Sequence, residues 1–497
     1  MRRANREYGC GCASLAWLRR RYPYPTQEDN HDDSIHEEAV LRGLCSCRCV
    51  QGRMPEHHAI SVCYGGDMSK HFHCLGIIVL LVTGCVANGN NSPSNQTSPP
   101  VSPASPPTYP TYSLDYFGMT SQNDMGGRPW PDVPVGVLRT FDSIWFEVEP
   151  EKGTWTFSRL DSDVALAQKS GGQIDLILSS TPTWASLQPT QPSYPGEPLG
   201  QAAGPANIQD WITYVQTIAT RYKGVVHDYE CWNEPDNINS YTGTVEQLIA
   251  MCQAAHSTLK EIDPSITFSS PAFMWWFSPL VESYFSSGGI GSFDTLNFHY
   301  SRDCSNPETL APWVANYKAL FAKYHLQSVP IWVSEFPYYV LSGPDAKWPE
   351  PASAFPPGSC PLDMHTSQEY VARMYIIGRT LGLYRIQWYA WADHLSAIVD
   401  DAGETDKPTT DAYRTVANWL MNTALVSSSR DAQGTWIVVI QTPGGNEEHI
   451  LWNDEEATFT TAIPSTWNVQ SAQDVAGISY AISSGNIPVS GMPVFLK

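Results

Sequence analysis

The sequence predicts a (β/α)8 TIM barrel followed by a small all-β sandwich domain, and three observations carry that prediction. Between residues 113 and 422, short β-rich runs alternate with helical segments, as in parallel strands joined by crossover helices. Two of these runs end in a glutamate followed closely by proline, Glu234 and Glu335. Within residues 423–497 the helical segments stop, and short β-rich runs lie between Gly, Pro and Asn turns.

Eight runs rich in β-branched and aromatic residues are the predicted barrel strands. They are residues 114–119, 135–141, 174–180, 226–232, 266–272, 295–300, 330–335 and 385–391. The intervening segments 210–222 and 369–383 place apolar residues at helical spacing. An open doubly wound sheet is the alternative fold, but no Gly-rich phosphate-binding turn follows the first run. The barrel is therefore favoured. The C-terminal domain could be a carbohydrate-binding module, although its shortness favours a structural sheet packed on the barrel.

Residues 1–67 differ in character from the rest of the chain. They hold six of the 12 cysteines and show no sustained hydrophobic periodicity. A zinc module is an alternative, but Cys45, Cys47 and Cys49 have one-residue spacings that do not fit common zinc sites. We interpret this stretch as an upstream extension and expect translation to start at Met68.

Residues 68–85 have the organisation of a signal peptide. Lys70 lies in a short polar start, an apolar run follows over residues 74–82, and Val-Thr-Gly-Cys ends at Cys85. The run is too short for a permanent membrane span, and its end resembles the lipobox of bacterial lipoproteins. The pattern predicts an exported protein anchored to a membrane by lipidation of Cys85. Residues 86–112 are a Pro/Ser-rich linker.

Composition excludes some partners. The formal net charge is −21, and no basic cluster follows residue 85, which argues against binding to nucleic acid or to an anionic membrane surface. The 18 Trp and 24 Tyr suit stacking against sugar rings, although an aromatic-rich core explains them equally well. We expect a carbohydrate substrate and a monomeric protein.

The two strand-end glutamates suggest paired carboxylate chemistry. Strand ends converge at one mouth of a TIM barrel, so Glu234 of the fourth run and Glu335 of the seventh should face each other. The WNEP motif at residues 232–235, with a glutamate in an aromatic context on the seventh strand, resembles the retaining glycoside hydrolases of clan A. Residues 138–161 and 176–186 further resemble family 39 of these enzymes and its relatives.

The resemblance implies a role for each matching residue. Glu234 would be the general acid/base, Glu335 the nucleophile, and Asn233 would bind the sugar 2-hydroxyl. His299 or Tyr300 would border the nucleophile, and the choice between them stays open because the clan often spaces this pair one residue further apart. No metal or cofactor is implied.

Further side chains have two interpretations each. Arg139 would keep Glu335 ionised or form an ordinary strand-end salt bridge. Trp388 or Trp391 would lie beneath the sugar in the cleaved subsite. Trp184 and Trp145 would be outer sugar platforms or would pack against their loops. Strand alternation points Glu230 into the barrel floor, where a structural role is expected.

The remaining predictions concern cysteines and competing functions. Cys231 and Cys252 are expected within the strand and helix cores, and Cys304 and Cys360 could form a disulfide at the pocket rim. A long insertion over residues 342–364 would form one wall of the cleft. A catalytically silent glycan-binding lipoprotein and an inverting hydrolase are the alternatives, and the sugar and the endo or exo mode stay open.

Overall fold

The structure is a computed structural model. It describes residues 111–121, 128–300, 305–340, 361–392, 396–399, 407–455 and 457–497. The predicted extension, the signal peptide with Cys85, nearly all of the linker, and Cys304 and Cys360 lie outside the described residues, as does most of the 342–364 insertion. In the part described, no helix has both the length and the apolar character needed to cross a membrane.

Within the described residues, eight parallel strands form one sheet in the order β5-β4-β3-β2-β1-β10-β7-β6. Their bounds are β1 Phe117–Ser121, β2 Val137–Thr140, β3 Gln173–Leu178, β4 Asp228–Cys231, β5 Thr267–Ser269, β6 Leu296–His299, β7 Ile331–Pro337 and β10 Arg385–Tyr389. Parallel bridges from Ser269 to Thr295 and from Phe273 to Phe298 join the two edge strands. The sheet therefore closes into a barrel.

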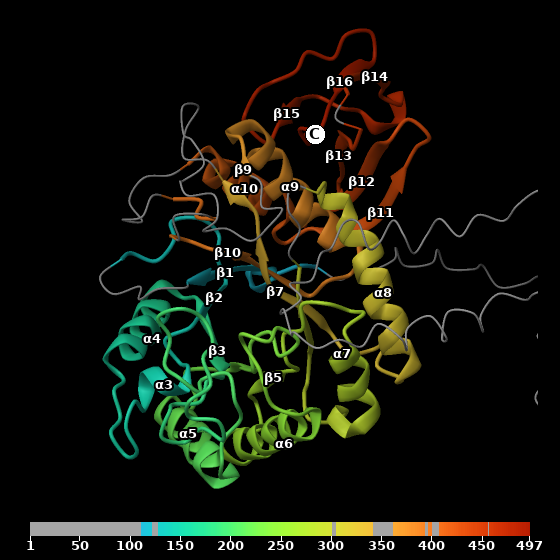
Figure 1. Ribbon diagram of the computed structural model, residues 1–497. Helices are drawn as coiled ribbons and strands as arrows, with labels where there is room; N and C mark the ends of the chain where they lie inside the picture. The colour runs from blue at the N-terminus through green and yellow to red at the C-terminus, as the bar shows by residue number, and fades with distance from the viewer. Residues whose placement is uncertain are drawn as a thin grey trace, which may run out of the picture. The chain divides into compact units, whose positions relative to one another are not determined.

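From β2 onward a helix follows each barrel strand, and the helices surround the barrel (Figure 1). They are α3 Trp145–Val148, α4 Ser158–Ser170, α5 Ile208–Arg221, α6 Val245–Ile262, α7 Pro279–Tyr284, α8 Leu310–Lys323, α9 Met364–Thr380 and α10 Pro408–Leu420. Shorter pieces are the helical turns η1 Leu114–Tyr116, η2 Phe285–Gly289 and η3 Pro307–Thr309, and the paired strands β8 Tyr339–Val340 and β9 Pro361–Leu362.

Each of the eight predicted runs overlaps one barrel strand, so the predicted fold class is confirmed. The amphipathic pattern read over residues 210–222 corresponds to α5, whose buried face carries Trp211, Tyr214, Val215 and Ile218. These side chains belong to the one large apolar cluster that fills the space between the sheet and its helices.

The C-terminal region has the expected all-β character. A five-stranded antiparallel sheet has the order β11-β12-β13-β17-β15, and β14 pairs with β16. The bounds are β11 Ala424–Arg430, β12 Thr435–Gln441, β13 Glu447–Asn453, β14 Phe459–Ala462, β15 Ala472–Asp474, β16 Asn486–Val489 and β17 Val494–Leu496, with a turn η5 Ser465–Trp467. Leu451 and Leu496 of the larger sheet share a small core with Ile487 and Val489 of the smaller one. The two sheets thus form a sandwich.

The sandwich packs directly on the barrel. Trp419 of α10 stacks on Phe495 of β17, with ring centroids 4.9 Å apart. Trp452 of β13 donates from its indole nitrogen to Glu308 at 2.7 Å, and Glu308 in turn accepts from Arg373 of α9. These contacts support the interpretation of the domain as a structural sheet.

Candidate active site

The end of β4 holds Glu234 by an unusual backbone path. Trp232 and Glu234 have left-handed φ values of 56° and 46°, which side chains other than glycine rarely adopt. Asn233 lies between them and pairs with Ala272 as a parallel bridge. Hydrogen bonds from Trp232 N to Leu178 O and from Glu234 N to Ala272 O anchor this turn to the end of β3 and to the loop after β5. The fold thus fixes the direction of the Glu234 side chain.

Glu335 lies near the end of β7, where the pairing with β6 is irregular. The register shifts between Phe298 and His299, so His299 comes opposite Glu335. Tyr300 N then donates to Glu335 O at 2.9 Å. This irregularity brings a histidine of β6 next to the carboxylate of β7.

Glu234, His299 and Glu335 converge at the barrel mouth. His299 Nδ1 lies 2.8 Å from Glu234 Oε1 and 3.7 Å from Glu335 Oε2. One ligand-type atom from each of the three side chains lies within 4.8 Å of the other two, so the two carboxyl groups are close neighbours. This spacing would also allow the three to hold one metal ion. The carboxylates are only 13% and 14% exposed, whereas His299 is buried.

Arg139 of β2 joins the two carboxylate strands. Its guanidinium donates twice to Glu230, at 2.7 and 3.1 Å, once to Asn233 Oδ1 at 2.7 Å, and once to Glu335 Oε2 at 2.9 Å. Glu230 also accepts from Asn297 at 2.9 Å. Arg139 therefore bonds Glu335, as expected, and Glu230 has the expected structural place in the barrel floor.

The pKa shifts of the cluster follow from burial and from these partners. Burial raises the pKa of Glu335, and the charges of His299 and Arg139 only partly oppose it. Burial also acts to raise the pKa of Glu234, but hydrogen bonds and charge from His299, with help from Asn237, lower it overall. Burial acts to lower the pKa of His299, yet the two carboxylates raise it. In the free protein, Glu234 is thus the more acidic of the two carboxyls.

Solved structures share this architecture. The chain matches a family 39 glycoside hydrolase from Bacteroides cellulosilyticus with a TM-score of 0.59 and 16% identity, over 78% of this chain and 81% of that one. It has the barrel fold of glycoside hydrolases. A family 39 enzyme from Xanthomonas axonopodis pv. citri gives a TM-score of 0.52 at 12% identity, covering 78% of this chain and 95% of that one. A family 30 endoxylanase from Clostridium papyrosolvens gives 0.51 at 12%, covering 78% and 97%.

Sequence comparison adds nothing to this likeness. No protein-family model matches the chain, and no curated protein is significantly similar to it.

The side chains of His299 and Tyr300 point in different directions. His299 points into the site, whereas the Tyr300 hydroxyl bonds Thr309 and its ring packs edge-on against Trp313. Of the two residues between which the sequence left the choice open, His299 is therefore the one whose side chain contacts the two carboxylates. Strand alternation explains the difference, because adjacent residues of a strand face opposite sides.

Most of the tryptophans expected as sugar platforms have their rings covered by neighbouring protein groups. Trp388 is fully buried, packs against Phe336 and donates to Ser396 O, so of the two strand-8 candidates it is not the sugar platform. Trp391 is also buried, and its role as a platform stays a prediction. For Trp145 the packing interpretation holds, because the ring is buried and stacks on Tyr214. Trp184 lies edge-on to Trp145 with the Lys152 ammonium over its ring but is only partly buried, so its role as a platform stays a prediction.

Two polar residues near Glu234 were missed from the sequence. Asn237 Nδ2 donates to Glu234 Oε2 at 3.3 Å and to the Tyr194 hydroxyl at 2.7 Å. The signal was modest, since Asn237 follows the WNEP motif by two residues and Tyr194 lies in the long loop after β3. Together they line the approach to Glu234.

An aromatic patch at the same barrel face was missed as well. Trp275, Trp276 and Phe277 follow β5, and Phe277 is 54% exposed. Asp236 fixes this loop by accepting from Met274 N and Trp275 N at 2.9 and 2.8 Å. The run Met-Trp-Trp-Phe directly after a predicted strand was the available signal.

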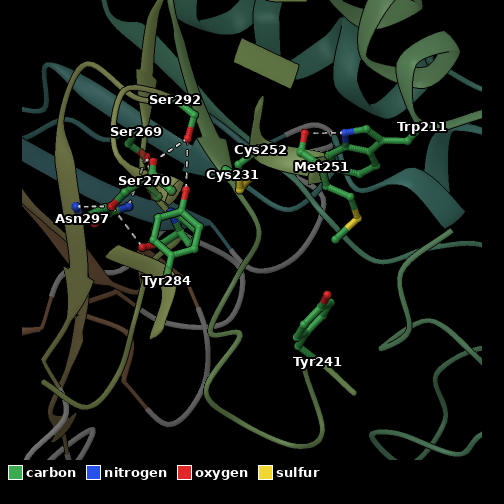
Figure 2. Close-up of a disulfide and its surroundings, with 12 residues drawn as sticks. Trp211, Cys231, Tyr241, Met251, Cys252, Ser269, Ser270, Tyr284, Ser292 and Asn297 are labelled. Atoms are coloured by element: carbon green, nitrogen blue, oxygen red, sulfur yellow. Dashed lines mark hydrogen bonds between the residues drawn. A yellow bond between two sulfur atoms is a disulfide. The ribbon is translucent and has the colours of Figure 1, made fainter. Parts of the chain in front are cut away.

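A disulfide joins β4 to α6 immediately before the turn that holds Glu234. Cys231 and Cys252 are bonded, with Cα atoms 5.7 Å apart, and both are fully buried (Figure 2). Their expected placement in the strand and helix cores is confirmed, and the disulfide between them was not predicted. The alternation of side chains along a strand was the available signal. Because Glu230 points into the barrel, Cys231 points outward to the helices.

Proposed function

We propose that this protein is a retaining β-glycosidase that uses Glu234 and Glu335 in a double displacement. The observation that carries the proposal is the pair of strand-end carboxyls, each with an oxygen within 4.8 Å of the other and of His299. Retaining enzymes hold their two carboxyl groups about 5 to 5.5 Å apart, whereas inverting enzymes need about 6.5 to 9.5 Å for an intervening water. The short separation supports retention over inversion.

In the first step, a carboxylate oxygen of Glu335 attacks the anomeric carbon and forms a glycosyl ester. The bond from that carbon to the leaving-group oxygen breaks, and Glu234 gives that oxygen its proton. Arg139 holds Glu335 in its ionised, attacking form. Asn233, oriented through its Oδ1 by the same guanidinium, offers its amide nitrogen to the sugar 2-hydroxyl.

The proton for this step lies between His299 and Glu234. In the free protein the histidine pKa is raised and the Glu234 pKa is lowered, which favours an imidazolium bonded to a carboxylate. Moving that proton along the 2.8 Å contact gives a neutral imidazole and a carboxylic acid, the form of Glu234 that can act as general acid. A bound sugar excludes water, and a drier site favours the neutral pair over two charges.

The second step reverses the proton flow. Water enters at the position of the departed group, and Glu234, now a carboxylate, accepts its proton. The hydroxide oxygen attacks the anomeric carbon, and the ester bond to Glu335 breaks. Two inversions at one carbon leave the sugar with its original configuration.

The substrate class follows from the surface around the mouth. Phe277 and its two tryptophan neighbours offer aromatic faces on the side of Glu234, where the leaving group lies, and aromatic rings stack on sugar rings. The structural neighbours include a protein named as an endoxylanase. A β-linked oligosaccharide or polysaccharide substrate fits both observations.

The test is hydrolysis of a panel of aryl β-glycosides and β-linked polysaccharides by the wild-type protein, Glu335→Ala and Glu234→Ala. We expect both variants to lose about 10³-fold or more of the turnover. Azide should rescue both, giving an inverted glycosyl azide with Glu335→Ala and a retained one with Glu234→Ala. The opposite pairing of products would exchange the two roles. Inactivity of the wild-type protein together with measurable binding of an oligosaccharide would favour the glycan-binding alternative.

We also propose that the protein is exported and anchored through a lipid on Cys85. The signal-peptide pattern of residues 68–85 motivates this, and the buried disulfide supports it because such bonds persist mainly in oxidising compartments. In a bacterial host supplied with labelled palmitate, wild-type protein should carry the label and partition with membranes. Cys85→Ala should remain unlabelled, and equal labelling of both would contradict the proposal.

A further inference from the structure

Beneath Arg139, the barrel interior contains an acid and an amide side by side. Asp175 of β3 and Gln387 of β10 are both fully buried, and Gln387 Nε2 donates to Asp175 Oδ2 at 3.2 Å. The other oxygen of each side chain, Asp175 Oδ1 and Gln387 Oε1, is buried and has no hydrogen-bond partner among the described residues. Both of these oxygens are hydrogen-bond acceptors, and neither has a donor in the described part of the chain. A proton between them would satisfy both.

The neighbouring strand makes room for this amide. Gly118 of β1 lies opposite Gln387 in the sheet register. A Cβ atom at Gly118 would lie 2.3 Å from Gln387 Cγ, a distance that real contacts do not reach. Any other residue at position 118 would therefore displace Gln387 from Asp175. The interior is shaped to hold a polar side chain at this place.

The charged groups around Asp175 are paired with one another. Arg139 of β2 bonds Glu230 of β4, and Arg385 of β10 pairs with Asp228 of β4 at 2.8 Å. Within the described residues no cation forms an ion pair with Asp175. Burial, followed by the charges of Glu230 and Asp228, raises the pKa of Asp175 to about 7 against the opposing effect of the two arginines.

We propose that Asp175 is a carboxylic acid in the working protein and forms a reciprocal acid–amide pair with Gln387. The amide N–H donates to Asp175 Oδ2, and the proton on Asp175 Oδ1 is donated to Gln387 Oε1. Both leftover oxygens are then satisfied by one proton taken up from solvent. An uncharged Asp175 also does not attract the Arg139 guanidinium, which therefore keeps its hydrogen bonds to Glu230, Asn233 and Glu335. Asp175 is thus a positioning residue for Arg139, and only this last consequence rests on the proposed function.

The substitution Asp175→Asn tests the pair, because an asparagine amide can donate to Gln387 Oε1 without titrating. Asp228→Asn is the matched control, since it removes a buried carboxylate that is paired with Arg385. We expect Asp175→Asn to fold and to unfold near the wild-type Tm at about pH 4, whereas Asp228→Asn should lose stability because it leaves Arg385 without its ion-pair partner.

The pH dependence of stability gives a readout that needs no activity. The folded-state pKa of Asp175 lies above its unfolded value of 3.8, so the stability from its proton is fully present below about pH 3.8 and is lost as the pH rises to about 7. The difference in Tm, Asp175→Asn minus wild type, should therefore increase by several degrees from about pH 4 to about pH 8. A constant difference, or losses like those of Asp228→Asn, would overturn the proposal.

Infrared spectroscopy of wild-type protein provides a second measurement should the variant fail to fold. With labelled aspartate, raising the pH from about 6 to about 8 should remove the carbonyl band of a buried carboxylic acid from the wild-type protein and also from Asp236→Asn, which lacks the other aspartate whose pKa is raised by burial. Absence of that band at pH 6 would show that Asp175 is ionised and would overturn the pair. Failure of the glycosidase assays would leave both readouts intact, so the two proposals can fail separately.

Discussion

At the scale of single residues, Arg139 is the point where the two halves of the site meet. Its guanidinium bonds Asn233 next to the proposed acid/base Glu234, the proposed nucleophile Glu335, and Glu230 in the barrel floor. The planar guanidinium of arginine donates hydrogen bonds in several fixed directions at once, and a lysine ammonium could not reproduce this geometry. The arrangement of the site therefore depends on one side chain.

Replacing that side chain should affect stability and turnover together. Arg139→Met leaves Glu230 buried without its cation, which should cost about 3–5 kcal/mol in unfolding free energy. Turnover should fall at least about 100-fold, since Glu335 and Asn233 lose their common donor. Urea unfolding and kcat measure the two effects. Arg221→Met is the control: Arg221 and its partner Asp161 are 43% and 40% exposed, and the loss of this pair should cost less than about 1 kcal/mol. Equal losses in both variants would contradict the assignment.

Asn237 should set the alkaline limit of activity. Its donated hydrogen bond stabilises the ionised form of Glu234 and lowers the pKa of that carboxyl. Asn237→Ala should raise the Glu234 pKa, so the alkaline limb of kcat/KM should move to higher pH with less than about a tenfold change in the maximum. The exposed neighbour Asn239, changed to Ala, provides the control. An unmoved limb would mean that Glu234 is not the group that must be protonated.

At the scale of elements, some placements could be predicted from the sequence and others could not. The eight strands were predictable because β-rich runs and amphipathic helices alternate without a break in pattern. Glu234 and Glu335 were predictable because each ends such a run. The period of two in Leu296–Tyr300 would have chosen His299 over Tyr300, since polar Asn297 and His299 share one face. The register shift that brings His299 opposite Glu335 leaves no trace in the sequence.

The link between β4 and α6 should contribute measurably to stability. Cys231 and Cys252 are 21 residues apart, and a crosslink closing a loop of this size contributes about 3 kcal/mol. The double substitution Cys231→Ala and Cys252→Ala should lose about that amount in urea unfolding and should also lower kcat, because the turn holding Glu234 begins one residue after Cys231. A non-reduced digest should show the 231–252 crosslink, and it also tests the predicted Cys304–Cys360 bond. Unchanged stability would contradict this account.

At the scale of the whole molecule, the barrel and the sandwich share one apolar core. Val438, Ile450 and Phe495 of the sandwich belong to the same buried cluster as the barrel strands. The bond from Trp452 to Glu308 adds a polar contact across the same boundary. Burial of this kind makes the two domains interdependent rather than independently stable.

Calorimetry should therefore show a single unfolding transition for the chain. Truncation after residue 422 should give a barrel that is insoluble or that melts well below the intact protein, because the apolar faces of α9 and α10 would be exposed. The control is Ile478→Ser, an exposed position on the sandwich far from the barrel contacts, which should leave the transition unchanged. Two separate transitions would instead support a detachable carbohydrate-binding module.

The buried crosslink beside the turn that holds Glu234 also matters for how the protein is produced. Cys231 and Cys252 have no contact with solvent, so oxidation has to occur while the chain is still folding. In a host that makes the protein in a reducing cytosol, both cysteines would remain thiols and would be buried in the folded protein. Preparations from the cytosol and from an oxidising compartment could thus differ in heat resistance while being identical in mass to within two hydrogens. Assays for substrate should begin with the oxidised form.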